Sequence, residues 1–339
     1  MIRFALLGCG RIGRVHADSI DVHPRAELAW VYDPIESAAS EVAERYGTTI
    51  APVVDVAIDD PSVDAVVIAS ATPTHVDLLS RAVRAGKAVL CEKPIDLELA
   101  RVDRCWTDIA ALNPMVMLGF NRRFDPSFRE VRDRVAAGGI GRLEQLTIVS
   151  RDPAPASRDY LAASGGLFRD MTIHDFDLAR FFLGEVAEVY AMGSNLVADY
   201  IAELGDIDGA VVVMRGANGV LCQITNSRRS VFGYDQRLEA FGSAGMLSVG
   251  NQHPTSVRLS NATHTEAAPE YLNFFLDRYT PAYRAELDHL ITAIEQGSQP
   301  SPGFADGREA LALADAALES LQTGRTVPLG SPARRETEV

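Results

Sequence analysis

The chain has 339 residues, 47% of them hydrophobic and 23% charged, which is the composition of a globular protein with room for about two domains. Its 46 acidic and 32 basic residues give a formal net charge of −14. This balance argues against nucleic acid or an anionic membrane as a partner, because neutralising phosphates requires basic patches, and it suits a small uncharged substrate better.

Neither a membrane segment nor a metal site is expected. No apolar run reaches the roughly 20 residues of a membrane helix, and the N-terminal MIRFALLGCG has no secretory cleavage signal. The cysteines Cys9, Cys91, Cys105 and Cys222 form no CxxC pair, and we expect reduced thiols in the cytoplasm. There is no HExxH motif and no Cys/His cluster that could bind zinc.

Strands and helices are predicted to alternate through the first third of the chain. Apolar runs bounded by turn residues predict strands at 2–8, 27–33, 64–70, 88–94 and 115–120. The segments between them have helical spacing, and Gly47 and Gly86 can end two of these helices. The alternation predicts a doubly wound parallel sheet with right-handed crossovers, in a dinucleotide-binding (Rossmann) domain of residues 1–120.

A glycine-rich loop, GCGRIG, joins the first strand to its helix. Gly8, Gly10 and Gly13 have the GxGxxG spacing that lets the backbone approach a pyrophosphate at a helix N-terminus. Asp33 ends the second strand about 20 residues downstream, where a carboxylate accepts the ribose hydroxyls. Since this carboxylate repels a 2′-phosphate and no basic residue follows it directly, we predict NAD rather than NADP. Arg11, inside the loop, either contacts the pyrophosphate or faces solvent.

From residue 121 the pattern changes to strands without regular intervening helices. These strands are predicted at 143–152, 186–193, 208–215, 220–228 and 236–242. One inserted helix is expected at 168–184, and two late helices at 281–297 and 306–324.

The overall prediction is therefore an α/β chain whose second part is an α+β domain with a large, mostly antiparallel open sheet. We expect this substrate-binding and oligomerisation domain over residues 121–330, followed by a flexible tail at 331–339. Because a large sheet with one uncovered face often packs against a copy of itself, a homo-oligomer is expected.

The predicted helix at 168–184 contains a dense group of ionisable residues. Asp170 and His174 are four positions apart and share one helix face. An Asp one turn before a His can accept its N–H, fix its tautomer and raise its basicity. The simpler alternative is an acidic residue at the positive end of a helix beside a satisfied histidine. Asp175 and Asp177 have no assigned role and either cap the helix, pair with Arg180 or face water.

Two further groups lie at the carboxyl ends of predicted parallel strands, where open α/β sheets bind ligands. Lys93 follows an apolar strand within CEKP. Thr72, Thr74 and His75 of ATPTH follow the strand at 64–70, and Thr74 is also a candidate N-cap of the next helix.

These motifs together carry a family resemblance. GCGRIGRVHA, ATPTH, CEKP, NRRFD and GGLFRDMTIHDFD occur in this order, and the chain resembles the glucose–fructose oxidoreductase and inositol dehydrogenase (Gfo/Idh/MocA) family over nearly its whole length. Within that family, SRDP, RDMTIHDFDLARFFLGE, GYDQRLEAFG and RYTPAYRAEL are most similar to myo-inositol 2-dehydrogenases. The resemblance implies an NAD-dependent oxidoreductase that converts a ring hydroxyl of a cyclic polyol, such as myo-inositol, to a ketone. It also favours a homotetramer.

The resemblance also implies roles for individual residues. The matching catalytic set is Lys93, Asp170 and His174. The matching substrate-binding set is Lys93, Arg123, Asp152, Asp170, His174 and Tyr234. The matching cofactor-binding set is Gly8, Gly10, Arg11, Ile12, Gly13, Asp33, Thr72, Thr74, His75, Glu92 and Lys93. Without a metal-binding motif, a side chain must take the hydroxyl proton, and we assign this to His174, oriented by Asp170. The Lys93 ammonium would stabilise the developing alkoxide and could relay the proton.

Three alternatives stay open. The same fold could act on scyllo-inositol, another inositol isomer or an aldose such as glucose, because a few polar side chains decide the substrate. A non-catalytic NAD-binding sensor is a second alternative, although such a protein would be expected to have lost Lys93 or His174. An aldose–aldose oxidoreductase that keeps its cofactor permanently would be expected to carry an export signal.

Overall fold

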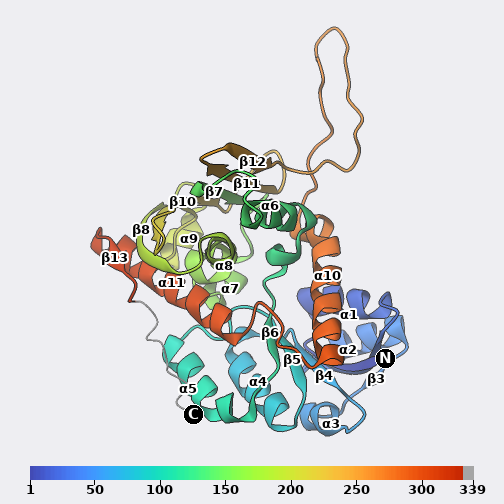
Figure 1. Cartoon of the computed structure of the whole chain (residues 1–339). Helices are drawn as coiled ribbons and strands as arrows, with labels where there is room; N and C mark the ends of the chain where they lie inside the picture. Colours follow the sequence, from blue (N-terminus) through green and yellow to red (C-terminus); the bar gives the residue numbers. More distant parts are fainter. Residues whose placement is uncertain (331–339) are drawn as a thin grey trace. The chain divides into compact units, whose positions relative to one another are not determined.

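The computed structural model describes residues 1–330, which fall into two compact units (Figure 1). The first unit comprises Met1–Asp125 and Tyr279–Leu311, and the second comprises Pro126–Arg278 and continues from Ala312. The expected domain division at residue 121 lies close to Asp125, but Tyr279–Leu311 groups with the first unit instead of the second. The flexible tail predicted at 331–339 lies outside the described residues.

The first unit contains a six-stranded sheet in the order β3-β2-β1-β4-β5-β6, and every neighbouring pair is parallel. Its strands are β1 (Ile2–Leu7), β2 (Ala26–Tyr32), β3 (Thr49–Ile50), β4 (Ala65–Ile68), β5 (Ala88–Cys91) and β6 (Val116–Leu118). All residues of β4, β5 and β6 are buried, as expected for a parallel sheet with helices on both faces. The predicted doubly wound sheet is confirmed.

Helices connect and cover these strands. They are α1 (Arg11–Asp21), α2 (Glu36–Tyr46), α3 (Val54–Asp59), α4 (His75–Arg84) and α5 (Leu99–Ile109), with 3₁₀ turns η1 (Thr72–Thr74), η2 (Ala110–Leu112) and η3 (Asn121–Phe124). Two long helices follow late in the chain, α10 (Phe275–Gln296) and α11 (Phe304–Thr323).

Polar contacts explain why the late segment joins the first unit. Arg25, which directly precedes β2, donates to Asp288 of α10 at 2.6 Å, and Figure 1 shows α10 beside α1. Leu118 of β6 donates its backbone N–H to the Pro302 carbonyl at 2.9 Å, and Arg308 of α11 donates to Asp103 of α5 at 2.6 Å. No sequence pattern links positions so far apart, so the prediction placed this segment with its chain neighbours.

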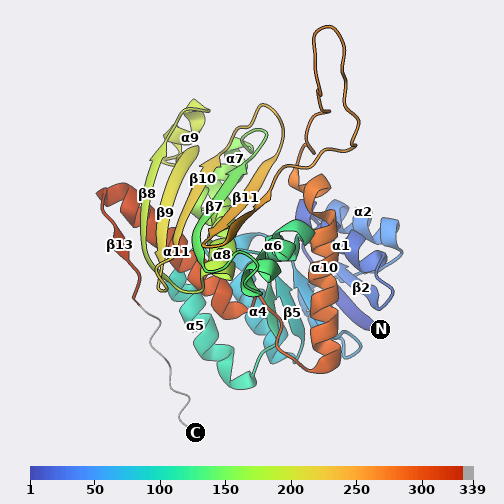
Figure 2. The same ribbon diagram turned by 45° about the horizontal axis from the view of Figure 1, so that its top comes forward.

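The second unit contains a seven-stranded sheet in the order β12-β11-β7-β10-β9-β8-β13 (Figure 2). Its strands are β7 (Leu143–Arg151), β8 (Val186–Ser194), β9 (Gly209–Gly216), β10 (Leu221–Ser227), β11 (Asp235–Gly242), β12 (Gly245–Val249) and β13 (Val327–Pro328). Neighbours are antiparallel except for the parallel pair β7–β10, so the predicted mostly antiparallel sheet is confirmed. The short edge strands β12 and β13 were not predicted.

The helices of the second unit are α6 (Pro126–Ala136), α7 (Arg158–Ala163), α8 (Ile173–Leu183) and α9 (Asp199–Glu203). The residues expected to open a single helix at 168–184 form instead a π-helical turn, Phe168–Thr172, directly before α8. The turn follows Gly165 and Gly166, whose φ angles of 83° and 87° break the chain direction there. Single π turns are frequent at functional sites. Within residues 1–330, no helix combines the length and the apolar composition that a membrane crossing requires.

Candidate functional site

The glycine loop of the first unit has the geometry of an anion-binding turn. A Cβ on Gly13 would lie 2.0 Å from the Gly8 carbonyl oxygen, and one on Gly8, where φ is +102°, would lie 2.5 Å from the Ala69 backbone. A Cβ on Gly10 would meet nothing within 4 Å, so the space in front of this residue is open. Helix α1 begins here with no side-chain cap and no acidic residue in its first turn. The loop therefore fits the pyrophosphate of a dinucleotide.

Asp33 stabilises the same loop. Its Oδ2 accepts the Cys9 backbone N–H at 2.7 Å, and its Oδ1 accepts the Ile35 backbone N–H at 2.8 Å. A carboxylate offers about four acceptor positions, so both oxygens of this half-buried residue can still accept a ribose hydroxyl. The loop-bracing role was not predicted. Arg11 and Ile12 form the first turn of α1, where Arg11 is exposed and Ile12 half-buried.

The rim after β4 is held together by its own polar groups. Thr74 occupies the N-cap position of α4, as predicted, but its hydroxyl donates to the Ala71 carbonyl at 2.8 Å and makes no side-chain cap hydrogen bond. His75 is buried, with Nδ1 2.8 Å from the Pro94 carbonyl and Nε2 3.0 Å from the Ser70 carbonyl. The imidazole thus ties the ATPTH segment, including half-buried Thr72, to the CEKP segment.

Lys93 follows β5 at its carboxyl end and is half-buried, and its catalytic role stays a prediction. Its neighbour Glu92 is buried, with Oε1 2.7 Å from Nε2 of His16 on α1. A Cβ on Gly119 would lie 2.8 Å from the Glu92 carboxylate, which explains the glycine there. His16 had no predicted role. His16 and Glu92 are 76 positions apart in the chain, so no local sequence pattern indicates that they meet.

Arg123 lies in η3, after β6, and is 6% exposed. Its Nη2 donates to Oδ1 of Asp306 at 2.9 Å, and Oδ2 of that aspartate accepts the Gly303 N–H at 2.9 Å. The guanidinium is therefore held in a fixed place, and its contact with a substrate stays a prediction.

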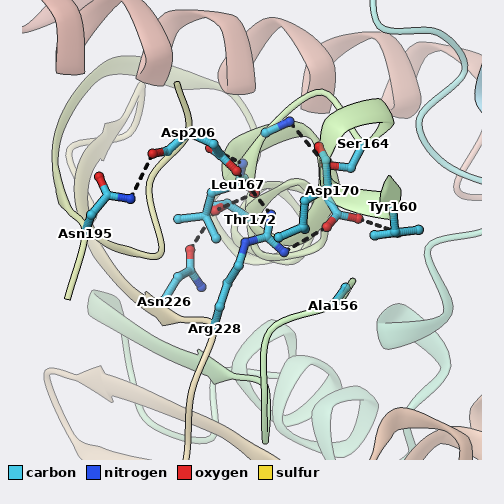
Figure 3. Close-up of polar contacts among 12 residues, drawn as sticks. Ala156, Tyr160, Ser164, Leu167, Asp170, Thr172, Asn195, Asp206, Asn226 and Arg228 are labelled. Atoms are coloured by element: carbon cyan, nitrogen blue, oxygen red, sulfur yellow. Dashed lines mark hydrogen bonds and ion pairs between the residues drawn. The ribbon is translucent and has the colours of Figure 1, made fainter. Parts of the chain in front are cut away.

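In the second unit, Asp170 lies in the π-helical turn and His174 in the first turn of α8. Figure 3 shows how the Asp170 carboxylate is held: Oδ1 accepts from the Tyr160 hydroxyl at 2.8 Å, and Oδ2 accepts from Nη1 of Arg228 at 3.0 Å. Asp170 and His174 are both half-buried, and the orientation of the imidazole by Asp170 stays a prediction. Neither Tyr160 nor Arg228 was predicted as a site residue.

Asp175 and Asp177 are buried, with exposures of 0% and 1%, so the interpretation that they face water is wrong. Oδ2 of Asp175 accepts from the Asn226 side chain at 2.8 Å, and Oδ1 of Asn226 accepts from the Thr172 hydroxyl at 2.7 Å. This chain of hydrogen bonds fixes the start of α8 on strand β10.

Strand register brings the other predicted residues of this unit to one end of the sheet. Arg151 pairs with Ser227 in the parallel neighbour β10 and with Asp235 in the antiparallel neighbour β11. The residues just beyond these positions are Asp152, Arg228 and Tyr234, so all three lie at the same end. Tyr234 is buried, with its ring centroid 6.1 Å from that of Phe274. Through Arg228, this end of the sheet also holds Asp170.

Among residues 1–330, no group of three or more His, Cys, Asp or Glu side chains is arranged to hold a metal ion. The four cysteines are buried and free, and burial raises the pKa of the Cys9 thiol to about 12.

Comparison with known proteins gives a consistent result along the whole chain. Residues 2–120 match the oxidoreductase family with an NAD-binding Rossmann fold, and residues 128–248 match the GFO/IDH/MocA C-terminal domain. The chain is 44% identical to an inositol 2-dehydrogenase from Rhizobium meliloti, over 97% of this chain and 99% of that protein. It is 43% identical to a myo-inositol 2-dehydrogenase from Thermotoga maritima, over 97% and 98%. The crystal structure of a myo-inositol dehydrogenase from Corynebacterium glutamicum matches with a TM-score of 0.95 and 52% identity, over 98% of this chain and 99% of that one.

Proposed function

The chain belongs to the Gfo/Idh/MocA family of oxidoreductases, and on that premise we propose that it is an NAD-dependent inositol 2-dehydrogenase. The reaction is the oxidation of the 2-hydroxyl of myo-inositol to a ketone. The single observation that carries this choice of substrate is the similarity to inositol 2-dehydrogenases over nearly the full length of both chains.

The first unit supplies the cofactor contacts in this proposal. The open space at Gly10 and the uncapped start of α1 receive the pyrophosphate, and Asp33 accepts the ribose hydroxyls. Bound NAD supplies the acceptor for the hydride that leaves the carbinol carbon. Thr72, Thr74, His75 and Glu92 shape the rim beside it, with His75 acting through the backbone that it holds.

Proton transfer is assigned to the second unit. The His174 imidazole takes the proton of the reacting hydroxyl, and Asp170 orients the imidazole and stabilises its charged form. Lys93, as an ammonium, donates a hydrogen bond to the same oxygen and stabilises the alkoxide as it develops. Positioned acid–base groups of this kind contribute about 10²- to 10⁴-fold to the rate.

The remaining hydroxyls of the ring are assigned to Arg123, Asp152 and Tyr234. A site built to hydrogen-bond several hydroxyls rejects an isomer that leaves one of its buried polar groups unpaired. This explains how a small number of side chains can distinguish myo-inositol from scyllo-inositol or glucose.

The test is a panel assay that follows NADH formation with myo-inositol, scyllo-inositol, D-chiro-inositol and glucose at pH 7 to 9. We expect the highest kcat/KM with myo-inositol and NAD. A higher kcat/KM with another polyol would assign that polyol as the substrate instead. NAD binding without turnover of any of the four compounds would favour a non-catalytic sensor.

We further propose a cytoplasmic homotetramer. Four buried thiols without a disulfide suit a reducing compartment. One face of the second unit's sheet exposes apolar side chains at Met192, Val211, Val213 and Leu221, with exposures between 44% and 61%, and a second copy of the chain could cover them. Light scattering should give the mass of a tetramer, and Val213→Asp should lower that mass.

A further inference from the structure

Arg228 is a fully buried cation close to the proposed catalytic aspartate. It follows strand β10, and its residue exposure is 1%. Nη1 donates to Oδ2 of Asp170 at 3.0 Å, and Nη2 lies 3.6 Å from Oδ2 of Asp206 (Figure 3). One guanidinium thus stands between two carboxylates that come from different segments of the chain.

Hydrogen bonds hold the backbone of Arg228 and the segments around it. The Arg228 backbone N–H donates to the Asp208 carbonyl at 2.8 Å, and the Asp208 carboxylate accepts three successive backbone N–H groups, of Leu196, Val197 and Ala198. Oδ1 of Asp206 accepts the N–H of Leu167, the residue just before the π-helical turn, at 2.9 Å. Arg228 therefore holds the Asp170 side chain of the π-helical turn, and Asp206 holds the backbone directly before that turn.

A buried ion pair of this kind is weak evidence for a role in stability, since the cost of desolvating two charges can exceed their mutual attraction. Asp170 does not pair with the arginine that is its neighbour in the sequence. Arg169 precedes Asp170 directly, yet it donates to Asp315 of α11 at 2.6 Å. The cation on Asp170 comes from 58 positions away.

We propose that Arg228 is a positioning residue that sets the orientation and the effective charge of Asp170, with the Tyr160 hydroxyl as its second support. Arg228 offsets part of the negative charge of the carboxylate. Asp170 can then orient His174 without holding the proton on the imidazole too strongly for the next turnover. This inference rests on the proposed roles of Asp170 and His174 in oxidation.

The groups that face the Asp170 carboxylate come from several elements. Tyr160 of α7 and Arg228, which follows β10, contact the carboxylate itself. Asp206, after α9, lies 3.6 Å from the same guanidinium, and His174 lies four positions beyond Asp170 on α8. Removing the arginine leaves the negative charge of Asp170, which we propose orients the imidazole, without its counter-cation. The charged imidazolium is then favoured, because a nearby opposite charge stabilises the charged form.

The experiment compares Arg228→Met, Arg228→Lys, Tyr160→Phe and the matched control Arg229→Met. Arg229 is the next residue in the chain, but it is exposed and contacts the Leu196 carbonyl instead. We measure kcat and KM for myo-inositol from pH 6 to 10. For Arg228→Met we expect kcat to fall about tenfold or more and the acidic limb of the pH profile to move up by about half a unit to one unit. Arg228→Lys should restore the position of this limb, and Arg229→Met should match the wild type.

Tyr160→Phe keeps the inference testable if Arg228→Met does not fold. Tyr160 is 48% exposed, so the loss of its hydroxyl should leave the fold intact. Here we expect about a threefold to tenfold fall in kcat, little change in KM and a shift of the acidic limb in the same direction. A wild-type kcat and a wild-type pH profile in Tyr160→Phe, or a lower melting temperature as the only effect of Arg228→Met, would overturn the inference.

A second measurement separates this inference from the proposed function. The chain has seven histidines, and the NMR signal of His174 can be assigned by its loss in His174→Ala. Titration of that signal should show a higher midpoint in Arg228→Met than in the wild type, whatever the substrate is. An unchanged midpoint would overturn the role of Arg228, whereas the absence of turnover with every polyol would overturn only the proposed function.

Discussion

The two units present their candidate site residues by different physical means. In the first unit, the glycine loop and the start of α1 offer backbone groups, and the contact from Asp33 to Cys9 spans 24 positions. In the second unit, Asp170 is held by side chains, those of the exposed Tyr160 and of the buried Arg228, which is 58 positions away. A backbone site is visible in a short stretch of sequence, whereas a site held by buried ion pairs depends on the complete fold.

The largest expected effect is in the second unit. His174→Ala removes the proposed base, so kcat/KM for myo-inositol should fall at least about a hundredfold. NAD affinity should remain near the wild-type value, because the cofactor contacts are assigned to the first unit. Steady-state kinetics and fluorescence titration with NADH measure the two quantities. A variant with unimpaired turnover would remove His174 from the mechanism.

A pair of glycine variants tests the backbone site in the first unit. Gly13→Ala places a Cβ 2.0 Å from the Gly8 carbonyl, so we expect at least about a tenfold loss of NAD affinity together with a lower melting temperature. Gly10→Ala is the matched control, because its Cβ meets nothing within 4 Å in the protein. It should keep the melting temperature and weaken only NAD binding. Equal NAD affinity in Gly10→Ala and the wild type would contradict a pyrophosphate at this position.

The next effect concerns the choice between the two cofactors. The wild type should have a higher kcat/KM with NAD than with NADP, because Asp33 repels the 2′-phosphate. Asp33→Asn removes the charge but keeps the shape, so the preference should shrink by about tenfold. The ratio of the two kcat/KM values measures this shift. An equal or higher wild-type value with NADP would defeat the assignment of Asp33 to the ribose.

The smallest effect lies away from both parts of the site. Trp30 donates to Oδ2 of Asp60 at 2.6 Å, and this bond, followed by those from Ser62, lowers the pKa of Asp60 to about 2 from its ordinary 3.8. Because the folded pKa lies below the unfolded one, the stabilisation is complete above the unfolded value and is lost as the pH falls from about 4 to 2. Denaturant unfolding of the wild type and Asp60→Asn should differ at pH 5 and converge near pH 2. A constant difference across this range would show that the charge contributes nothing.

The sequence was sufficient for the parts that local patterns determine. The parallel sheet was predicted from apolar strands that alternate with glycine-capped helices and from the GxGxxG loop. The open antiparallel sheet was predicted from strands that follow one another without regular helices between them. The sequence was not sufficient where residues far apart in the chain contact each other in the fold. The grouping of Tyr279–Leu311 with the first unit, the π turn at Asp170, the buried Asp175 and the clamp by Arg228 all depend on tertiary contacts. The alternative that Asp175 faces water was wrong because its carboxylate accepts a hydrogen bond from Asn226 within the fold.

The central proposal is that Lys93 and His174 both serve the transfer of one hydroxyl proton. The most direct measurement is kcat/KM for myo-inositol in Lys93→Ala, in His174→Ala and in the double variant, with melting temperatures to confirm folding. If the two groups serve one proton transfer, the double variant should be little worse than the worse single variant, since residues that act as a unit are not additive. A double variant whose loss equals the product of the two single losses would contradict the claim.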